Sequence, residues 1–397
     1  MSEWKEYKLD EVYDFGSGLS KPRNEFGFGY GFLAYKDIFA NYFVPDELSQ
    51  LVNSTEKERK TCSVLKGDVF LTRTSETDDE LGMSSVALKD YPEATFNGFT
   101  KRLRAKGTVK VLPEYAGFYF RSPGFRAAVS SISSITTRAS LNNDMLSSLS
   151  ILLPEIEEQQ RIAGILKALH DKIELLYSQN TTLESMAEIL FRQWFVEAKE
   201  EWTNCILEDL CIQVNSGGTP STKISEYYNG TINWYSTKEL NDNFLNESTS
   251  KITLPGLENS SAKLFPKGTV VIAIYAAPTV GRLGILSNEA AFNQAACGLV
   301  ANENICSKEF IYLYLKNQRD ELNAMASGSA QQNLNVGKIK TYPAFMPDSD
   351  TMNSFQSVVK PMFNKIETNT SQIRTLTTLR DTLLPKLMSG EVRVAAD

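Results

Sequence analysis

The 397-residue sequence predicts an α/β fold of two similar globular domains and two long antiparallel helices that pair as a coiled coil. Two observations lead to this prediction. Apolar residues recur at alternating steps of three and four in two long segments, and blocks of the first half of the chain return in the second half. The expected boundaries are a globular domain at 1–153, a helical region at 154–200, a second globular domain at 201–343 and a second helical region at 344–397.

The two helical segments follow Pro154 and Pro347, and each carries one row of apolar residues at heptad spacing, which we call a seam. Each seam contains one asparagine, Asn180 or Asn369, and a buried polar residue at such a position usually fixes the register of a helix pair. Two unrelated amphipathic helices on separate domains are the alternative, which the matching copies disfavour. The apolar seam residues are Ile162, Leu166, Leu169, Ile173, Leu176, Leu183, Leu190 and Trp194, and then Phe355, Met362, Ile366, Ile373, Leu376, Leu383 and Leu387.

The globular domains match in blocks whose spacing changes only between blocks. Trp4 returns as Trp202, Lys66-Gly67 as Lys267-Gly268, and Phe96-Asn97 as Phe292-Asn293. Insertions in the loops of a duplicated fold would produce this pattern. Apolar runs between turn signals predict strands, and helical periods predict one helix in each copy. The expected strands are 68–73, 84–88 and 99–105, with 269–275, 284–286 and 295–300 in the second copy, and the expected helices are 114–132 and 307–326.

Composition limits the class of protein. The chain is 42% hydrophobic and 22% charged, as in an ordinary globular protein. It contains no apolar run of membrane-spanning length and its N-terminus lacks the apolar core of a signal peptide, so we expect a cytoplasmic protein. The 5 cysteines show no CxxC spacing, which disfavours a disulfide framework or a zinc site. The net charge of −7 excludes a strongly basic nucleic-acid domain but allows a locally basic surface.

Catalytic motifs are weak throughout. The one histidine, His170, lies beside a seam residue and is interpreted as structural, which disfavours a Ser-His-Asp triad or a His-rich metal site. Glycine-rich strings at 16–18 and 27–31 lack the strand and helix that flank a nucleotide loop. Carboxylates between 46 and 58 resemble a nuclease pattern, but the second copy has no equivalent. We therefore predict a chain that is not itself an enzyme and that binds no metal or cofactor.

Basic and small polar residues gather instead in corresponding loops of the two copies. Arginine can pair with guanine and glutamine with adenine, while hydroxyl and backbone N–H groups suit phosphates. The alternative is that these residues form solvated turns, and Arg138 with Gln331 and Gln332 are the side chains to test first for base contact. The predicted DNA-binding residues are Lys21, Arg23, Lys36, Arg73, Thr74, Lys101, Arg102, Thr137 and Arg138 in the first copy, and Gly217, Gly218, Thr219, Lys223, Tyr235, Lys238, Arg282, Gln331 and Gln332 in the second.

Several strings together resemble the DNA specificity subunit of type I restriction-modification systems. They are EEQQRIAGIL at 157–166, LLPKLMSGEVRV at 383–394, SGGTPS at 216–221 and INWYSTKEL at 232–240. The resemblance covers the whole chain. One departure is that the second helix begins with DTMNSFQSVV at 350–359 and lacks the EQQ pattern, so its first contacts are expected to differ.

This resemblance implies two target recognition domains, each reading one half of an asymmetric bipartite site in double-stranded DNA, with the helices setting the spacer. It further implies two modification subunits that carry S-adenosylmethionine and methylate adenine N6, and restriction subunits that use ATP and Mg²⁺. A nuclease or methyltransferase acting alone, or a coiled-coil scaffold without a DNA role, are the alternatives from other classes.

Overall fold

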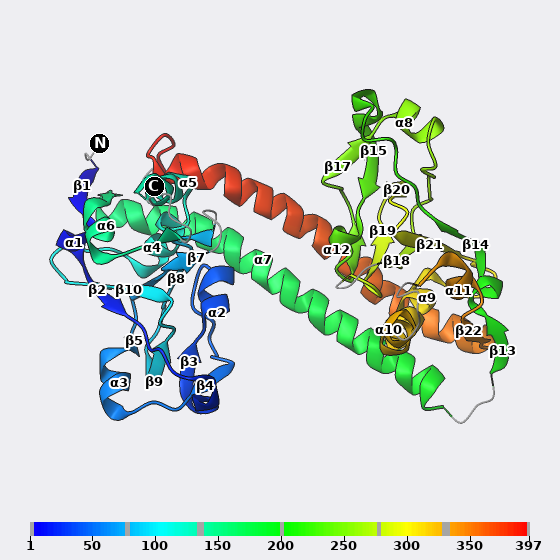
Figure 1. Cartoon of the computed structure of the whole chain (residues 1–397), viewed down its shortest axis with the longest axis horizontal. Coiled ribbons are helices and arrows are strands. Elements are labelled where there is room, and N and C mark those ends of the chain that lie inside the picture. Colours follow the sequence, from blue (N-terminus) through cyan, green and yellow to red (C-terminus); the bar gives the residue numbers. More distant parts are fainter. Residues whose placement is uncertain are drawn as a thin grey trace. The chain divides into compact units, whose positions relative to one another are not determined.

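The computed structural model describes residues 4–75, 80–132, 139–198, 202–275, 279–327 and 334–394. It divides into two compact units. The first unit comprises Met1–Lys172 and Leu376–Asp397, and the second comprises Ile173–Thr375. Each unit therefore contains one globular part and one portion of each long helix (Figure 1).

The first unit is built on a four-stranded sheet of order β2-β10-β6-β8, with β2 at Tyr13–Ser17, β6 at Val69–Thr72, β8 at Ser84–Val86 and β10 at Thr100–Ala105. All residues of β6 are buried, as expected for a central strand with an apolar run. A second sheet has the order β4-β3-β9-β5. Its strands are β3 (Phe26–Leu33), β4 (Gln50–Val52), β5 (Ser63–Val64) and β9 (Tyr91–Phe96). Two short strand pairs complete the unit: β1 (Lys5–Lys8) with β12 (Ser150–Leu153), and β7 (Thr74–Ser75) with β11 (Ala139–Ser140). The helical segments are α1 (Leu9–Val12), η1 (Arg23–Glu25), α2 (Tyr35–Ala40), α3 (Glu56–Thr61), α4 (Pro113–Tyr119), α5 (Pro123–Ile132) and α6 (Asn143–Ser148).

The second unit repeats these pairings. Its main sheet has the order β14-β21-β18-β19-β16, and its smaller sheets are β17-β15-β20 and β13-β22. The parallel pair β3 and β9 returns as the parallel pair β15 and β20. The strands are β13 (Thr203–Ile206), β14 (Cys211–Ser216), β15 (Tyr228–Tyr235), β16 (Asn243–Leu245), β17 (Ser250–Ile252), β18 (Val270–Ala273), β19 (Leu283–Leu286), β20 (Ala291–Phe292), β21 (Ala296–Ala301) and β22 (Pro343–Met346). The helical segments are η4 (Leu207–Leu210), η5 (Ser225–Tyr227), η6 (Thr237–Glu239), α8 (Leu254–Glu258), α9 (Lys308–Asn317), α10 (Arg319–Ser327) and α11 (Val336–Lys340).

The predicted strands are confirmed, but each predicted helix of the globular parts is broken in two. Helix α4 ends at Tyr119 and α5 begins at Pro123, because proline has no N–H to donate within a continuous helix. In the second unit α9 ends before Gln318, whose backbone (φ −89°, ψ 6°) has left helical geometry. The prediction of uninterrupted helices at 114–132 and 307–326 was therefore wrong.

The break places one arginine of each unit against a neighbouring loop. Arg121 donates to the carbonyls of Ile38, Phe39 and Asn41 at 2.8–2.9 Å, and Arg319 donates to the Asp242 carboxylate at 2.5 and 2.7 Å. Arg121 thereby holds the end of α2 and the residue after it, and Arg319 holds the segment that follows η6.

Both long helices are present: α7 at Ile156–Phe191, continued by the π-helical turn η3 at Arg192–Val196, and α12 at Ser349–Met388. All predicted seam residues are buried or half-buried. In the first unit Ile162 and Leu166 share a core with Leu384 and Leu387. In the second unit the end of α7 shares a core with the start of α12. Within each unit, then, the start of one helix packs with the end of the other.

The two seam asparagines meet in the second unit. The Nδ2 of Asn369 donates to the Oδ1 of Asn180 at 2.8 Å, and Asn369 is fully buried. A buried amide pair of this kind favours one register, because a shifted register would leave both amides without partners.

The EQQ string fixes the start of α7. Glu158 is buried, pairs with Arg393 at 2.8 Å and accepts from the indole of Trp4 at 3.2 Å. The Gln159 amide bonds to the backbone of Leu112 and Lys110. In α12 the buried Met352 occupies the place that Gln159 has in α7 and joins the apolar core of the second unit, so the first contacts of the two helices differ, as expected from the missing EQQ pattern.

Candidate nucleic-acid interface

Three chain segments leave the main sheet of the first unit at one edge. β2 ends at Ser17, β6 ends at Thr72 and β10 begins at Thr100, with Lys101 opposite both Ser17 and Leu71. The segments at 18–21, 73–75 and 97–99 therefore lie together beyond the paired strands. We call the group Ser17, Arg73, Phe99 and Lys101 the first edge.

The first edge contains two cations. The ammonium of Lys101 is almost buried and donates to Ser17 Oγ at 3.1 Å and to Asn143 Oδ1 at 2.8 Å. Burial, followed by the nearby charge of Arg73, lowers the pKa of Lys101. The Nε of Arg73 is also buried, and among the described residues it has no hydrogen-bond partner. Two cations without a described acidic partner form a local positive site in a chain whose net charge is negative.

Other predicted residues of the first copy are placed differently. Arg102 donates to the carbonyls of Thr61 and Ser63 at 3.1 and 2.9 Å, so its guanidinium is used inside the fold. Lys21 pairs with Glu58 at 2.9 Å, and the Thr55 backbone together with Lys21 lowers the pKa of Glu58 to about 2. Arg23 and Lys36 are exposed. Lys36 follows Tyr35, whose hydroxyl donates at 3.2 Å to the carbonyl of Thr74, the residue after Arg73.

The glycines of the second copy have a structural role. A Cβ on Gly217 would collide with the Phe292 carbonyl, and one on Gly218 would collide with the Ser261 carbonyl. Their N–H groups donate to the carbonyls of Ala296 and Phe292 at 3.1 and 2.9 Å. Both glycines are buried. The prediction that they contact DNA was wrong, because close packing and internal hydrogen bonds already use them.

Of the other predicted residues of the second copy, some are bonded or buried within the fold and others are exposed. Tyr235 is 1% exposed within the core of β15, so its predicted DNA contact was also wrong. The hydroxyl of Thr219 donates to the side-chain oxygen of Gln294. Arg282 donates to the side chain of Asn241 at 3.2 Å. Lys223 and Lys238 are exposed, and Thr137, Arg138, Gln331 and Gln332 lie outside the described residues.

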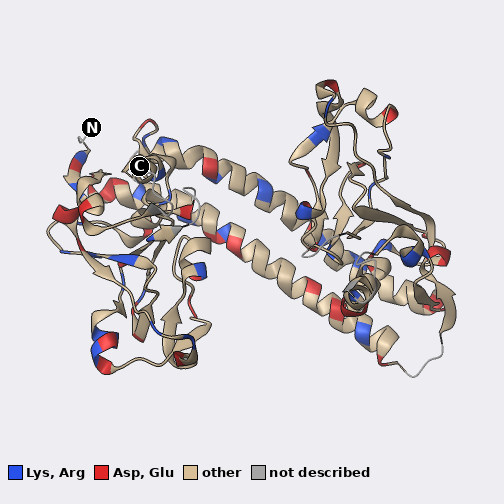
Figure 2. Cartoon of the chain, in the orientation of Figure 1, with Lys and Arg blue, Asp and Glu red and all other residues tan. Residues whose placement is uncertain are grey.

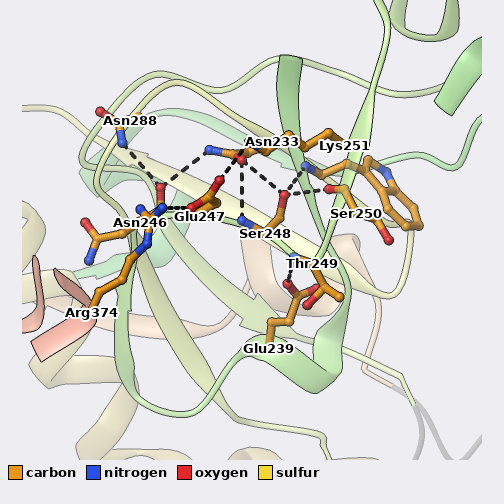
Figure 3. Close-up of polar contacts among 11 residues, drawn as sticks. Asn233, Glu239, Asn246, Glu247, Ser248, Thr249, Ser250, Lys251, Asn288 and Arg374 are labelled. Atoms are coloured by element: carbon orange, nitrogen blue, oxygen red, sulfur yellow. Dashed lines mark hydrogen bonds and ion pairs between the residues drawn. The ribbon is translucent and has the colours of Figure 1, made fainter. Parts of the chain in front are cut away.

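A polar network orders the loop at 246–249 between β16 and β17, which sequence reasoning missed (Figure 3). The Ser248 hydroxyl donates to Asn233 at 3.2 Å, and the Thr249 N–H donates to Glu239 at 2.8 Å. Glu247 forms ion pairs with Lys251 and with Arg374 of α12. The loop is thus tied to β15, to η6 and to the helix of its own unit.

Charge is interspersed over both units, as Figure 2 shows for the long helices and for α3. Within the described residues no three His, Cys, Asp or Glu side chains are placed to hold a metal ion. In the same part of the chain no helix is both long and apolar enough to cross a membrane. Because charges of both signs are interspersed elsewhere, the two cations of the first edge form a local positive site.

Comparison with known proteins gives one consistent family. The model of the type I restriction modification DNA specificity domain matches residues 1–185 and 199–377. The MjaIX specificity subunit of Methanocaldococcus jannaschii is 27% identical over 99% of this chain and 94% of its own length. The HindI specificity subunit of Haemophilus influenzae is 25% identical over 99% and 100%. The S subunit structure from M. genitalium has a similar fold, with a TM-score of 0.65 at 13% identity, covering 99% of this chain and 97% of that one.

Proposed function

The chain belongs to the type I restriction modification DNA specificity family and is a sequence-specificity subunit, and from this premise we propose that each globular part reads one half of an asymmetric bipartite DNA site. One observation supports this division: the two units share the same backbone arrangement at the edge of the main sheet but carry different side chains there. The turn before β10 and the turn before β21 share their backbone hydrogen bonds, whereas the side chains around them differ in charge and size. Direct readout depends on side chains at base edges, so unequal edges favour unequal half-sites.

The long helices are proposed to pair as a coiled coil that sets the distance between the half-sites. The buried seams and the asparagine pair support this role, because they fix the register of the two helices in the second unit. The spacer of the DNA site would then depend on helix length.

The outer faces of the same helices are proposed to dock two modification subunits. Each unit exposes an equivalent pair of apolar side chains, Ile165 and Leu379 in the first and Val358 and Met186 in the second. Exposed apolar side chains of this kind suit a protein partner. Methylation of adenine N6 with S-adenosylmethionine would be performed by these partners, and ATP and Mg²⁺ would be used by restriction subunits. The proposal assigns no catalytic step to this chain.

Exchanging residues 201–343 for the corresponding domain of another specificity subunit is expected to change one half of the recognised site. The reason is that the exchanged segment contains the loops and sheet edge of the second unit and leaves the first edge intact. Mapping methylated adenines in cells that express the chimaera with its modification subunits measures the outcome. The reciprocal exchange of residues 1–153 is the control and should change the other half, and a change of both halves by either exchange would contradict the division.

Lengthening both helices by seven residues, after Asn180 and after Asn369, is expected to lengthen the spacer. One heptad preserves the seam and adds about 10 Å of helix, which corresponds to roughly three base pairs of DNA. The spacer is again read from methylated sites. A seven-residue insertion at Gly107, an exposed turn with φ +80°, is the control that should leave the spacer unchanged. Methylation with an unaltered spacer in the lengthened protein would refute the role of the helices.

A further inference from the structure

Phe99 is an exposed aromatic residue that the fold holds in a fixed position. Its side chain is 62% exposed in the turn between β9 and β10. The Phe99 N–H donates to Asn97 Oδ1 at 2.7 Å, and its carbonyl accepts from the Arg73 N–H at 2.8 Å. The turn is therefore rigid, although the ring itself buries little apolar surface inside the protein.

The two cationic residues of the first edge are close to Phe99 along the backbone. Arg73 is bonded to Phe99 through the backbone, and Lys101 lies two residues further along the chain. Proteins that grip nucleic acid combine positive charge for phosphates with apolar or aromatic side chains for bases. Lys101 itself is too buried to touch a ligand, so its charge acts from beneath the surface, while Arg73 is half-buried at the edge.

The second unit has the same turn with different side chains. The Ala295 N–H donates to Asn293 Oδ1 at 3.1 Å, and the Ala295 carbonyl accepts from the Ile274 N–H at 2.8 Å. Alanine thus stands where Phe99 does, isoleucine where Arg73 does, and the buried Cys297 where Lys101 does. Gln294 is exposed here and accepts from Thr219. Phe99, Arg73 and Lys101 therefore have no counterpart at the equivalent positions of the second unit, which indicates that the common frame does not require them.

We propose that Phe99 is a base-contacting residue of the first half-site and that Arg73 binds the adjacent DNA phosphate. The ring packs against a base in the groove, and the charges of Arg73 and Lys101 hold the strand that bears it. This assignment rests on the proposed function of the chain, and it concerns double-stranded DNA rather than a protein partner, because the residue bonded to Phe99 through the backbone and the residue two positions after it are both cationic.

Phe99→Ala should weaken specific binding about tenfold and relax the base preference in one half-site only. The full-length chain with its modification subunits is used to select duplexes from a random pool, and affinity for the selected duplex is measured by fluorescence anisotropy. Phe99→Tyr should retain both affinity and preference, because the aromatic face remains. Phe28→Ala is the matched control, since Phe28 is 51% exposed on β3 of the same unit and should be neutral.

Arg73→Gln should reduce the slope of log affinity against log salt by about one without changing the selected sequence, as expected for a lost phosphate contact. Lys66→Gln, an exposed charge at the opposite end of β6, should leave the slope unchanged. Unaltered affinity and selection for Phe99→Ala would overturn the inference while leaving the proposed function intact. The inference would also be overturned, and the proposed function left intact, if Phe99→Ala no longer bound the modification subunits but kept its DNA preference. A parent chain that selects no bipartite sequence would overturn both.

Discussion

Replacing Phe355 with alanine is expected to lower the free energy of unfolding by about 3–5 kcal/mol. Phe355 is 1% exposed, and its ring centroid lies 4.8 Å from that of Phe195 and 5.8 Å from that of Trp194. Alanine would remove the buried ring and leave a cavity. Because Phe195 also packs against Phe310 and Phe345, the surrounding rings have little freedom to collapse into that space. Urea denaturation of the full chain, followed by tryptophan fluorescence, measures the loss.

Val358→Ala is the matched control for this experiment. Val358 lies on the same helix three residues further on and is 42% exposed, so its truncation should change the free energy of unfolding by less than about 0.5 kcal/mol. If Phe355→Ala and Val358→Ala unfolded at the same urea concentration as the parent, the buried seam would not be what stabilises the second unit.

The long helices and the repeated frame were predictable because their signals are local and redundant. A heptad period extends over many residues, and each copy supports the interpretation of the other. The pairing of Asn180 with Asn369 follows from the same two rows. Strands such as β6 and β18 were found because an apolar run between turns needs no tertiary information to be recognised.

The errors arose where tertiary contacts decide the role of a residue. The sequence near 216–221 contains glycines that look suited to a phosphate, but their N–H groups are used by neighbouring strands. Lys101 looks like a surface cation, but the register of β10 turns it toward Ser17. Phe99 was missed because a single aromatic residue in a turn belongs to no period, and only the structure shows that it is exposed. The break before Pro123 has a local signal that was overlooked, whereas the contacts of Arg121 and Arg319 with residues distant in sequence could not be predicted.

His170 shows how the repeat explains a residue that would otherwise suggest catalysis. Its ring lies 5.3 Å from that of Tyr42 and 5.5 Å from that of Phe43, centroid to centroid. The equivalent position of α12 is Phe363, which packs against Phe244 and Tyr312 in the second unit. His170 therefore takes the place of a core phenylalanine, and the structural role inferred from the sequence agrees with these contacts.

His170→Phe is expected to remove a pH dependence of stability that the parent shows in acid. Burial, and then the charge of Arg380, lowers the pKa of His170 from 6.5 to about 4; Lys167 and Arg121 act in the same direction and Asp171 opposes them. Between these two values the unfolded chain binds a proton that the folded chain does not. The contribution is therefore fully present above about pH 6.5 and is lost as the pH falls toward 4.

With allowance for solvent screening of this half-buried ring, the loss amounts to about 2 kcal/mol. Carboxylates also titrate in this range, but they do so equally in parent and variant, so the difference between the two proteins isolates His170. Urea denaturation at pH 7, 6 and 5 should show the parent losing stability relative to the variant at each step, with similar stability at pH 7 because a phenylalanine already fits the equivalent contacts around Phe363. A constant difference across this range would mean that His170 binds protons equally in the folded and the unfolded chain, so that its ring would not be desolvated, and the phenylalanine-like role assigned to it would then be wrong.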